Sequence, residues 1–337
     1  MHMNALKNLS KSGKRKLIYA SLAAVAVAFF ATIPFWLDVN RSYFGYYFFI
    51  VCIYAVAAQA WNLVCGYAGQ ISLAGNAFFG LGAYTMAMLW WYDVTHTMYF
   101  LDPLLMVLSG ITPVILAIIV GFPLLSRLRG DYFSFGTLGV AMIVSALFLN
   151  GGDFTRGAEG IYLDSSRFSS LDVYYWVALL LAVLATLVVY FMTTSRIGLA
   201  LKAIREDEVA AASHGINVLR YKMIAFMVSA FMAGVAGSLF GYYQFHVEPN
   251  GFFSMNWLFY PILMVVLGGT GTIFGPWIGA FFIGALFAYG DIYVGGYHPI
   301  LSGVLIILVM KFMPGGIMGL AEKVPHLYSR ASARRSR

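Results

Sequence analysis

The stretch Val173-Tyr-Tyr-Trp-Val-Ala-Leu-Leu-Leu-Ala-Val-Leu-Ala-Thr-Leu-Val-Val-Tyr-Phe-Met192 contains no charged side chain. A helix of about 20 apolar residues is long enough to cross the hydrocarbon layer of a bilayer. Comparable apolar runs occur at Leu17–Leu37, Phe44–Cys65, Leu104–Leu125, Tyr132–Asn150, Met223–Tyr243 and Ile300–Met313, and shorter ones at Ala77–Trp91, Trp257–Leu267 and Pro276–Gly290. The sequence therefore predicts an all-α, polytopic transmembrane helical bundle with about ten crossings, or about eight if an adjacent pair of short runs stays outside the count.

The composition agrees with a membrane protein. Hydrophobic residues make up 61% of the 337 residues and charged residues 10%, and the mean hydropathy is +0.80. A soluble domain carries roughly 25% charged residues, so a water-soluble fold is excluded. We expect a basic tail at 1–16, a membrane domain at 17–313 with a charged loop at 193–222, and a second basic tail at 314–337. The first apolar run is longer than the core of a signal peptide, which favours a retained span.

The charges predict the orientation of the bundle, because Lys and Arg collect on the cytoplasmic side of membrane spans. With a cytoplasmic N-terminus, 18 of the 21 basic residues fall inside, and both termini are cytoplasmic. Nine acidic residues fall outside: Asp38, Asp93, Asp102, Asp153, Glu159, Asp164, Asp172, Glu248 and Asp291. The net charge of +7 then reflects topology and contact with anionic lipid headgroups, and we expect no nucleic-acid partner.

The sequence offers few groups for chemistry. The predicted spans have no Asp, Glu, Lys, Arg or His near their centres, where proton relays and ion pathways are usually marked by such groups. The six histidines lie in loops and tails without metal-ligand spacing. In the stretch Gly268–Gly275, Phe274 replaces the third glycine of a dinucleotide fingerprint, and no P-loop lysine follows. We therefore expect no metal and no cofactor bound by this chain, and no enzyme activity.

Small residues recur every four positions in two places. One row consists of Gly271, Gly275 and Gly279, and the other of Ala233, Gly237 and Gly241. Such rows let membrane helices pack backbone to backbone. We interpret both rows as helix-packing surfaces.

A glycine-rich stretch between Gln59 and Thr85 predicts a broken or re-entrant segment. It combines five glycines with amide and hydroxyl side chains among apolar residues. Irregular backbone at membrane depth is tolerated only where protein buries it or where it lines a wet cavity. The stretch is the best candidate for a polar pathway, with Asn62, Gln70, Ser72 and Asn76 as candidate lining residues. A second, compatible interpretation is that these side chains only satisfy backbone groups freed by the break.

The charged loop predicts a docking element. Its segment Arg205-Glu-Asp-Glu208 is followed by Val209, the alanines Ala210 and Ala211, and then Gly215, which indicates a short helix closed by a glycine, with Ile216 folding back onto it. Alanines cover little area, so another protein could approach this helix closely. A solvated connector helix is the alternative.

Five motifs in one order resemble a known family. They are Gly66–Tyr84, Leu128–Leu138, Thr155–Ile161, Gly198–Tyr221 and Val266–Pro276, and they resemble the LivM-type permease of branched-chain amino-acid ABC importers over about residues 45–320. The resemblance implies an ABC importer permease fold in a bacterial inner membrane. It also implies as partners a LivH-type permease, two cytoplasmic ATPases that bind ATP and Mg, and a solute-binding protein.

Within this family the charged loop resembles the coupling helix, or EAA loop, that docks in a cleft of the ATPase. The resemblance assigns this role to Arg205, Glu206, Asp207, Glu208, Ala210, Ala211 and Gly215, although Val209 separates the glutamate from the alanines. The family also includes importers of urea, short amides or aromatic carboxylates, which remain alternatives. A passive channel is a further alternative, but it leaves the charged loop without a role.

Overall fold

The computed structural model describes residues 28–35, 42–94, 101–164 and 170–294, with short pieces between 303 and 319. Within these ranges the regular structure is helical apart from one pair of two-residue strands, so the predicted all-α membrane bundle is confirmed. Six segments of this described part are apolar and long enough to cross a membrane: Tyr43–Tyr67, Pro103–Arg127, Asp131–Leu149, Leu171–Thr194, Val218–Gln244 and Pro249–Gly268. The predicted tail 1–16, most of the predicted tail 314–337 and most of the runs Leu17–Leu37 and Ile300–Met313 lie outside the described residues. The number of crossings therefore stays a prediction.

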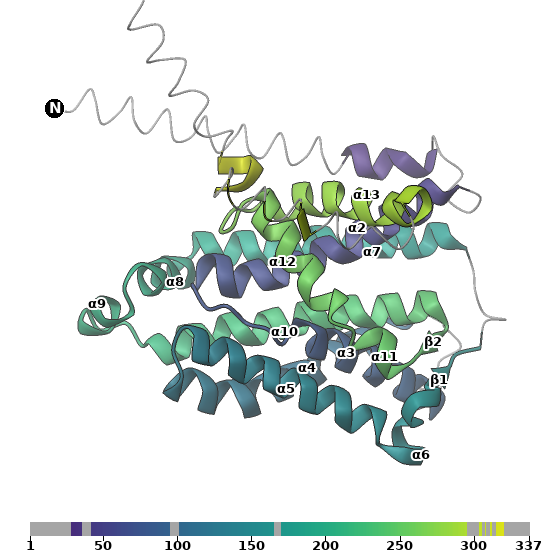
Figure 1. Cartoon of the computed structure of the whole chain (residues 1–337), viewed down its shortest axis with the longest axis horizontal. Helices are drawn as coiled ribbons and strands as arrows, with labels where there is room; N and C mark the ends of the chain where they lie inside the picture. The colour runs from purple at the N-terminus through teal and green to yellow at the C-terminus, as the bar shows by residue number, and fades with distance from the viewer. Residues whose placement is uncertain are drawn as a thin grey trace, which may run out of the picture.

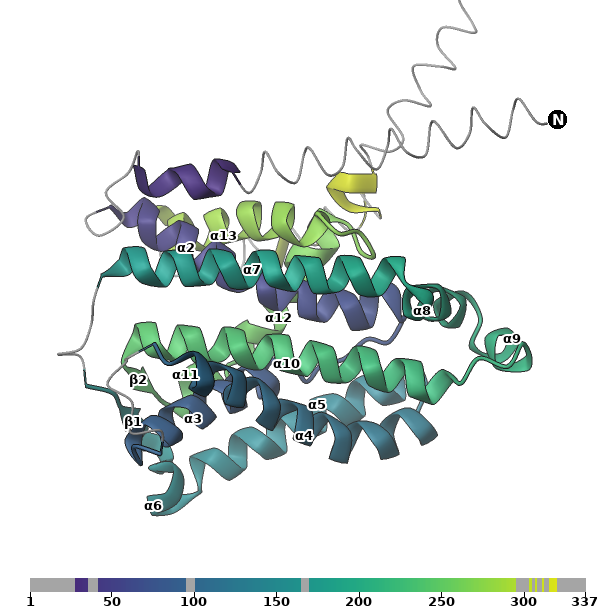
Figure 2. The ribbon, with the colours of Figure 1, turned by 180° about the vertical axis from the view of Figure 1, so that it is seen from behind.

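The long helices run side by side, with a pair of short helices at one end of the bundle and the strand pair at the other (Figures 1 and 2). The long helices are α2 (Tyr43–Asn62), α3 (Gly75–Trp91), α4 (Pro103–Arg127), α5 (Asp131–Leu149), α7 (Leu171–Thr194), α10 (Val218–Gln244), α12 (Asn256–Gly268) and α13 (Gly275–Val294). The short elements are a π-helix (Leu63–Tyr67), α6 (Gly152–Thr155), a 3₁₀ turn (Gly157–Glu159), α8 (Arg196–Glu206), α9 (Glu208–Ser213), α11 (Pro249–Phe252), β1 (Ile161–Tyr162) and β2 (His246–Val247).

Local sequence signals explain where the long helices begin. Asp102 precedes α4 and accepts a hydrogen bond from the backbone N–H of Leu104 at 2.8 Å, while Pro103 occupies the first helical position. Asn217 precedes α10 and accepts from the backbone N–H of Arg220 at 3.0 Å. These side chains satisfy N–H groups that have no partner inside the helix, and proline has no N–H to satisfy.

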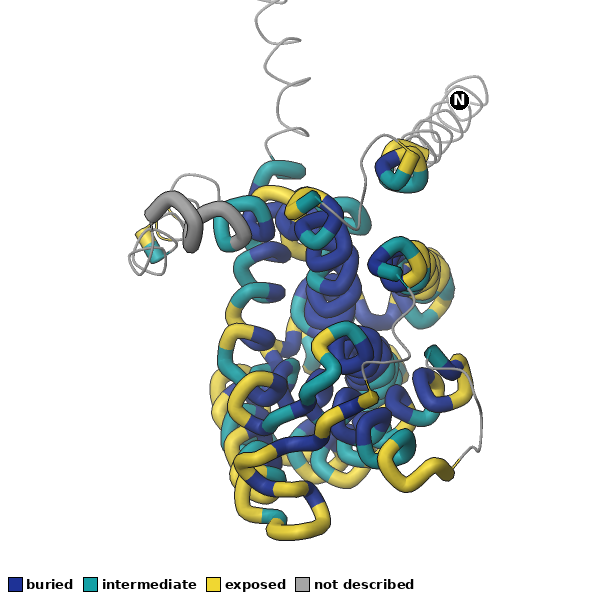
Figure 3. The backbone as a smooth tube through the Cα atoms, turned by 90° about the vertical axis from the view of Figure 1, so that its right-hand side faces the viewer, coloured by how far each residue is buried: buried dark blue, intermediate teal, exposed yellow. Residues whose placement is uncertain are grey.

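Helix α10 lies at the centre of the bundle, where it packs against α2, α3 and α4. Most of its residues are buried, as the dark blue core in Figure 3 shows. Glycines permit the close approach: a Cβ atom at Gly82 would overlap the backbone of Gly234, and one at Gly237 would overlap the carbonyl oxygen of Phe79. Because no side chain stands between them at these points, α3 and α10 pack backbone to backbone.

Helices α12 and α13 form a second close pair. A Cβ atom at Gly279 would overlap the carbonyl oxygen of Met264, and one at Gly268 would overlap that of Gly275. The expected row of small residues needs one correction, because Gly271 lies in the loop before α13 with a φ of 72°. That left-handed backbone conformation is open to glycine but is unfavourable in a helix of L-residues. Gly241, on the other row, faces the methyl end of Met86.

Most basic residues of the described part lie at one end of the bundle. Arg127 ends α4, and α8 and the first turn of α10 carry further basic residues at the same end as α9 (Figure 2). Asp102 and Asp172 lie where α4 and α7 begin, at the end that carries β1 and β2. Basic residues that are spread along the sequence therefore gather at one end of the folded bundle.

Candidate functional site

The predicted interruption lies directly after α2. The π-helix Leu63–Tyr67 ends α2, and an extended stretch then leads to α3, which begins at Gly75. Side chains of α5 form hydrogen bonds with the backbone groups of this stretch. The Ser134 hydroxyl donates to the carbonyl of Ile71 at 2.7 Å, and the Thr137 hydroxyl accepts from the N–H of Leu73 at 2.9 Å. The irregular backbone is therefore held in place by protein, as burial in a membrane requires.

Asn62, the last residue of α2, holds the loop between α12 and α13. Its Oδ1 accepts from the backbone N–H of Gly271 at 2.8 Å, and its Nδ2 donates to the carbonyl of Thr272 at 2.8 Å. Gln59, one turn earlier, donates to the carbonyl of Ile273 at 2.7 Å. These amides connect two interruptions that lie about 200 residues apart in the sequence.

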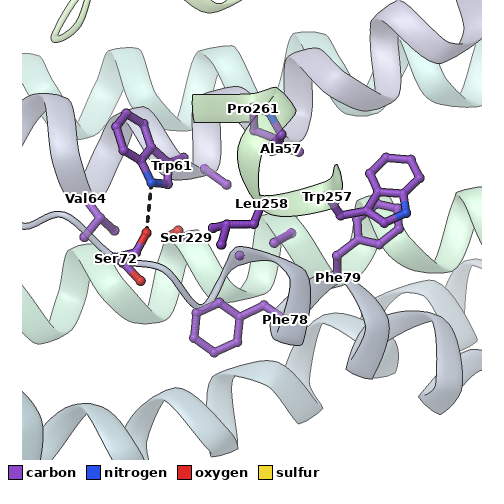
Figure 4. A pocket seen from close by; sticks show the side chains of 13 residues that line it. Ala57, Trp61, Val64, Ser72, Phe78, Phe79, Ser229, Trp257, Leu258 and Pro261 are labelled. Atoms are coloured by element: carbon purple, nitrogen blue, oxygen red, sulfur yellow. Dashed lines mark hydrogen bonds between the residues drawn. The ribbon is translucent and has the colours of Figure 1, made fainter. Parts of the chain in front are cut away.

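A small cavity lies beside the interrupted segment. It has a volume of about 20 Å³, which is room for about one water molecule. Its walls are aliphatic and aromatic except for the hydroxyl groups of Ser72 and Ser229, and they come from α2, α10, α12 and the stretch that begins α3. Figure 4 shows Trp61 donating to the carbonyl of Ser72, at 2.9 Å, on one side of this cavity, and Trp257 beside Phe79 at the other.

The four candidate pathway residues are all buried, and they have different surroundings. Ser72 lines the cavity, Asn62 holds the α12–α13 loop, and Asn76 donates to the carbonyl of Phe253 at 2.8 Å. Gln70 donates to the neighbouring carbonyl of Gly69 at 3.4 Å. In the described part of the chain, the side-chain oxygens of Gln70 and Asn76 have no hydrogen-bond partner. Asn62 and Asn76 satisfy backbone groups, as the second interpretation expects. That the four residues line a polar pathway stays a prediction.

The charged loop forms two helices where one was expected. Asp207 separates α8 from α9, because its extended backbone ends α8 and its carboxylate accepts from the N–H groups of Val209 and Ala210 at 2.8 and 2.9 Å. Helix α9 is the predicted short helix. Gly215, with a φ of 83°, closes it, and the N–H of Ile216 donates back to the carbonyl of Ala211 at 3.1 Å.

Glu208 points toward the bundle. One carboxylate oxygen lies 2.7 Å from Nζ of Lys222, which is buried in the first turn of α10, and the other lies 3.7 Å from Nε of Arg129, in the connection between α4 and α5. Charge-assisted hydrogen bonds to a buried partner are stronger than those at a surface. Helix α9 is therefore anchored to the ends of three long helices.

Arg205 links α8 to the interruption. Its Nη1 donates to the carbonyl of Gly66, which lies in the π-helix, and its chain packs against Gly69 and Gly271. The guanidinium is also close to the C-terminal end of α2, where a positive charge is favourable because the last carbonyls of a helix carry partial negative charge.

The outward face of α9 is short and nearly uncharged. Val209 and Ala210 are exposed, whereas Ala211 is buried. Glu206 is exposed at the end of α8. Five of the seven predicted docking residues are exposed: Arg205, Glu206, Asp207, Ala210 and Gly215. Ala211 is buried, and Glu208 is half-buried and directed inward.

Sequence reasoning missed three residues of this region. Lys222 and Arg129 hold Glu208, and Trp257 borders the cavity. The sequence gives no signal for the pair of Lys222 and Glu208, because the two residues lie 14 positions apart and no local pattern pairs them. Trp257 stands in an apolar run, where an aromatic residue is usually part of the core.

Interrupted helices around a small cavity, with helices α8 and α9 attached to them at one end, define a multi-pass membrane permease. The chain matches the family described as branched-chain amino acid transport system / permease component over residues 46–310, and it belongs to that family. The match leaves out only the ends of the chain.

Individual relatives show the same likeness. The high-affinity branched-chain amino acid transport system permease protein LivM of Salmonella typhimurium is 32% identical over 92% of this chain and 76% of its own length. The LivM protein of Escherichia coli is 31% identical over the same shares. The permease protein LivH of Salmonella typhimurium is 35% identical over 47% of this chain and 50% of its own length. No solved structure matches the chain.

Proposed function

We propose that this chain is one membrane-spanning subunit of an ATP-driven ABC importer that takes up the branched-chain amino acids leucine, isoleucine and valine. The names of the LivM and LivH relatives support the substrate class. The aliphatic and aromatic walls of the cavity support it too, because they suit an apolar side chain.

One observation carries the proposal: α8 and α9 are connected to the segment that borders the cavity. Glu208 binds Lys222 at the start of α10, and Arg205 binds the carbonyl of Gly66 in the interruption. Ser72, six residues after Gly66, lines the cavity. A partner that displaces α9 therefore moves the helices and the loop that shape the cavity as connected bodies.

The partners follow from this arrangement and from the family. Two cytoplasmic ATPases bind ATP and Mg, and one of them docks on α8 and α9. A LivH-type permease completes the membrane part, and a solute-binding protein delivers the solute at the opposite end. In this proposal the basic end of the bundle and both termini lie in the cytoplasm, and the membrane is a bacterial inner membrane.

The names of the LivM and LivH relatives favour branched-chain amino acids over urea, short amides and aromatic carboxylates. A passive channel needs a continuous wet path. The cavity has room for about one water molecule, which suits a closed state of a gated transporter.

The test uses the chain reconstituted in proteoliposomes with its partner permease, ATPases and binding protein. We expect leucine uptake that requires ATP hydrolysis. Ala210→Arg on the exposed face of α9 should lower uptake and ATPase co-purification by about tenfold, because a long charged side chain cannot enter a close interface. The matched control is Ala158→Arg, at an exposed position at the opposite end of the bundle, which should keep ATPase co-purification. Uptake without ATP, or unchanged uptake in Ala210→Arg, contradicts the proposal.

A further inference from the structure

A second, larger hollow opens at the end of the bundle opposite α9. This recess has a volume of about 430 Å³, within the range of small-ligand sites. Its lining comes from α2, α10, β2, α11, α12 and the turns between them. The aromatic part consists of Tyr54, Phe240, Phe252, Trp257 and Tyr260, and the polar part of Gln244, His246, Glu248, Asn250, Ser254 and Asn256.

The polar part has one formally charged group. Glu248 supplies a half-buried carboxylate, and the described lining residues include no Lys or Arg. His246 is already engaged, because its Nε2 lies 2.9 Å from the carbonyl of Glu159 and its ring stacks on Tyr162. A lone carboxylate attracts an ammonium group and repels a second carboxylate.

The amide and aromatic side chains of the recess suit the other two parts of an amino acid, its carboxylate and its apolar side chain. The side-chain amides of Asn250 and Asn256 can donate to a carboxylate without adding charge. The aromatic part offers apolar area to a side chain of several carbons. A small amino acid with a free α-ammonium group presents all three features, whereas the corresponding 2-oxo acid lacks the ammonium.

Trp257 separates the recess from the small cavity, because its side chain lines both. Its ring stacks on Phe79 with centroids 3.9 Å apart, and it meets the edge of Phe240 at 4.7 Å and Tyr54 at 5.1 Å. Figure 4 shows Trp257 and Phe79 together at the end of the cavity that faces away from Ser72. These four rings come from four different helices, so a relative shift of the helices opens the stack.

We propose that the recess is an outer subsite that receives a small apolar amino acid, with its α-ammonium at Glu248, and that the Trp257 stack closes the passage from this subsite to the Ser72 cavity. The substrate class rests on the proposed function, and the site itself rests on the recess and its lining. A solute then occupies the recess before the helices shift, and it passes Trp257 when they do.

Binding in the recess is tested by protection of a cysteine. Ser254→Cys places a thiol in the recess of the purified importer complex, and the chain without this change, which has Cys52 and Cys65, gives the background. Leucine should slow labelling by a polar thiol reagent, and its 2-oxo analogue 4-methyl-2-oxopentanoate should not. Adding Glu248→Gln should raise the leucine concentration needed for half protection about tenfold, which is the loss of one charge-assisted hydrogen bond. Equal protection by both compounds, no protection by leucine, or an unchanged concentration in Glu248→Gln overturns the assignment.

The partition is tested from the outer side. Ser72→Cys places a thiol in the small cavity, and a membrane-impermeant reagent is added to the face that carries the recess. Labelling should be slow with Trp257 present and about tenfold faster in Trp257→Ala, while Trp257→Phe, which keeps a ring in the stack, should stay close to the parent. Equal labelling rates with Trp257 and with alanine there overturn the partition.

These measurements separate the subsite from the proposed function. Protection by leucine needs no ATP, so it remains if uptake proves independent of ATP hydrolysis. ATP-driven uptake that is insensitive to Glu248→Gln leaves the importer intact and removes the subsite.

Discussion

Nζ of Lys222 lies 2.7 Å from Oε2 of Glu208, and the lysine side chain is 1% exposed. This ion pair connects α9, which lies at one end of the bundle, with α10, which lies at the centre of the bundle. Glu208 therefore makes its contacts inside the protein and anchors α9 to α10. On the side of α9 that faces away from the bundle, Val209 and Ala210 are exposed.

The pair predicts a difference between single and double variants. Glu208→Ala leaves the buried ammonium of Lys222 without its carboxylate, so we expect a loss of about 3 kcal/mol in the free energy of unfolding. Glu208→Ala combined with Lys222→Met removes both charges and should recover most of that stability, because no buried charge is then left without a partner. Thermal unfolding of the detergent-solubilised complex measures both.

Uptake in the same double variant tests the role of Glu208. If Glu208 is an anchor, uptake recovers together with stability. A stable double variant that does not transport would show that the carboxylate itself contacts the ATPase.

Arg205 predicts a separation of ATP hydrolysis from uptake. Arg205→Ala removes the hydrogen bond to the carbonyl of Gly66, so α8 loses its direct link to the interruption. We expect ATP hydrolysis to continue and the amount of leucine carried per ATP to fall about tenfold. Lys202→Ala is the control, because Lys202 is an exposed basic residue on the same helix. An equal ratio in the Arg205 variant and the control would disprove the link.

The glycine contacts predict which alanine substitutions the fold tolerates. Gly237→Ala places a methyl group onto the carbonyl oxygen of Phe79, so α3 and α10 must separate. We expect a loss of about 1–3 kcal/mol in the free energy of unfolding. Gly139→Ala, on α5, meets nothing within 4 Å and should be neutral or slightly stabilising, because alanine favours a helix. Equal stability of the two variants would show that α3 and α10 are less closely packed than described.

Asn62 and Ser72 predict different consequences within one polar stretch. Asn62→Ala leaves the N–H of Gly271 and the carbonyl of Thr272 without partners, at a cost of about 1–3 kcal/mol in stability. Ser72→Ala should cost less stability, because it keeps the backbone carbonyl that holds Trp61 and loses only the long hydrogen bond, 3.4 Å, from the Ala74 N–H to the hydroxyl. Its expected effect is on the KM of leucine uptake, since its hydroxyl lies at the cavity. A stable Asn62→Ala protein, or a Ser72→Ala protein with unchanged kinetics, would contradict this division.

The interruptions show how far the sequence leads. Glycines and amides between Asn62 and Asn76 were sufficient to predict a broken segment, because backbone in a membrane must be satisfied wherever a helix stops. They were not sufficient to tell which of these residues line a pathway and which only hold neighbouring backbone in place. The partner of Asn62 is a loop more than 200 residues away, and no property of Asn62 distinguishes it from a residue that faces a solute.

The sequence by itself determined the membrane bundle, the charged loop and its short helix, since these depend on the transfer of apolar runs into lipid and on residues that end a helix locally. The tertiary structure alone decided that Glu208 turns inward to Lys222, that Arg205 reaches Gly66 and that Trp257 stands between two hollows. Each of these depends on the packing of segments that are distant in the chain, and the direction of a side chain is set by the neighbours that packing supplies.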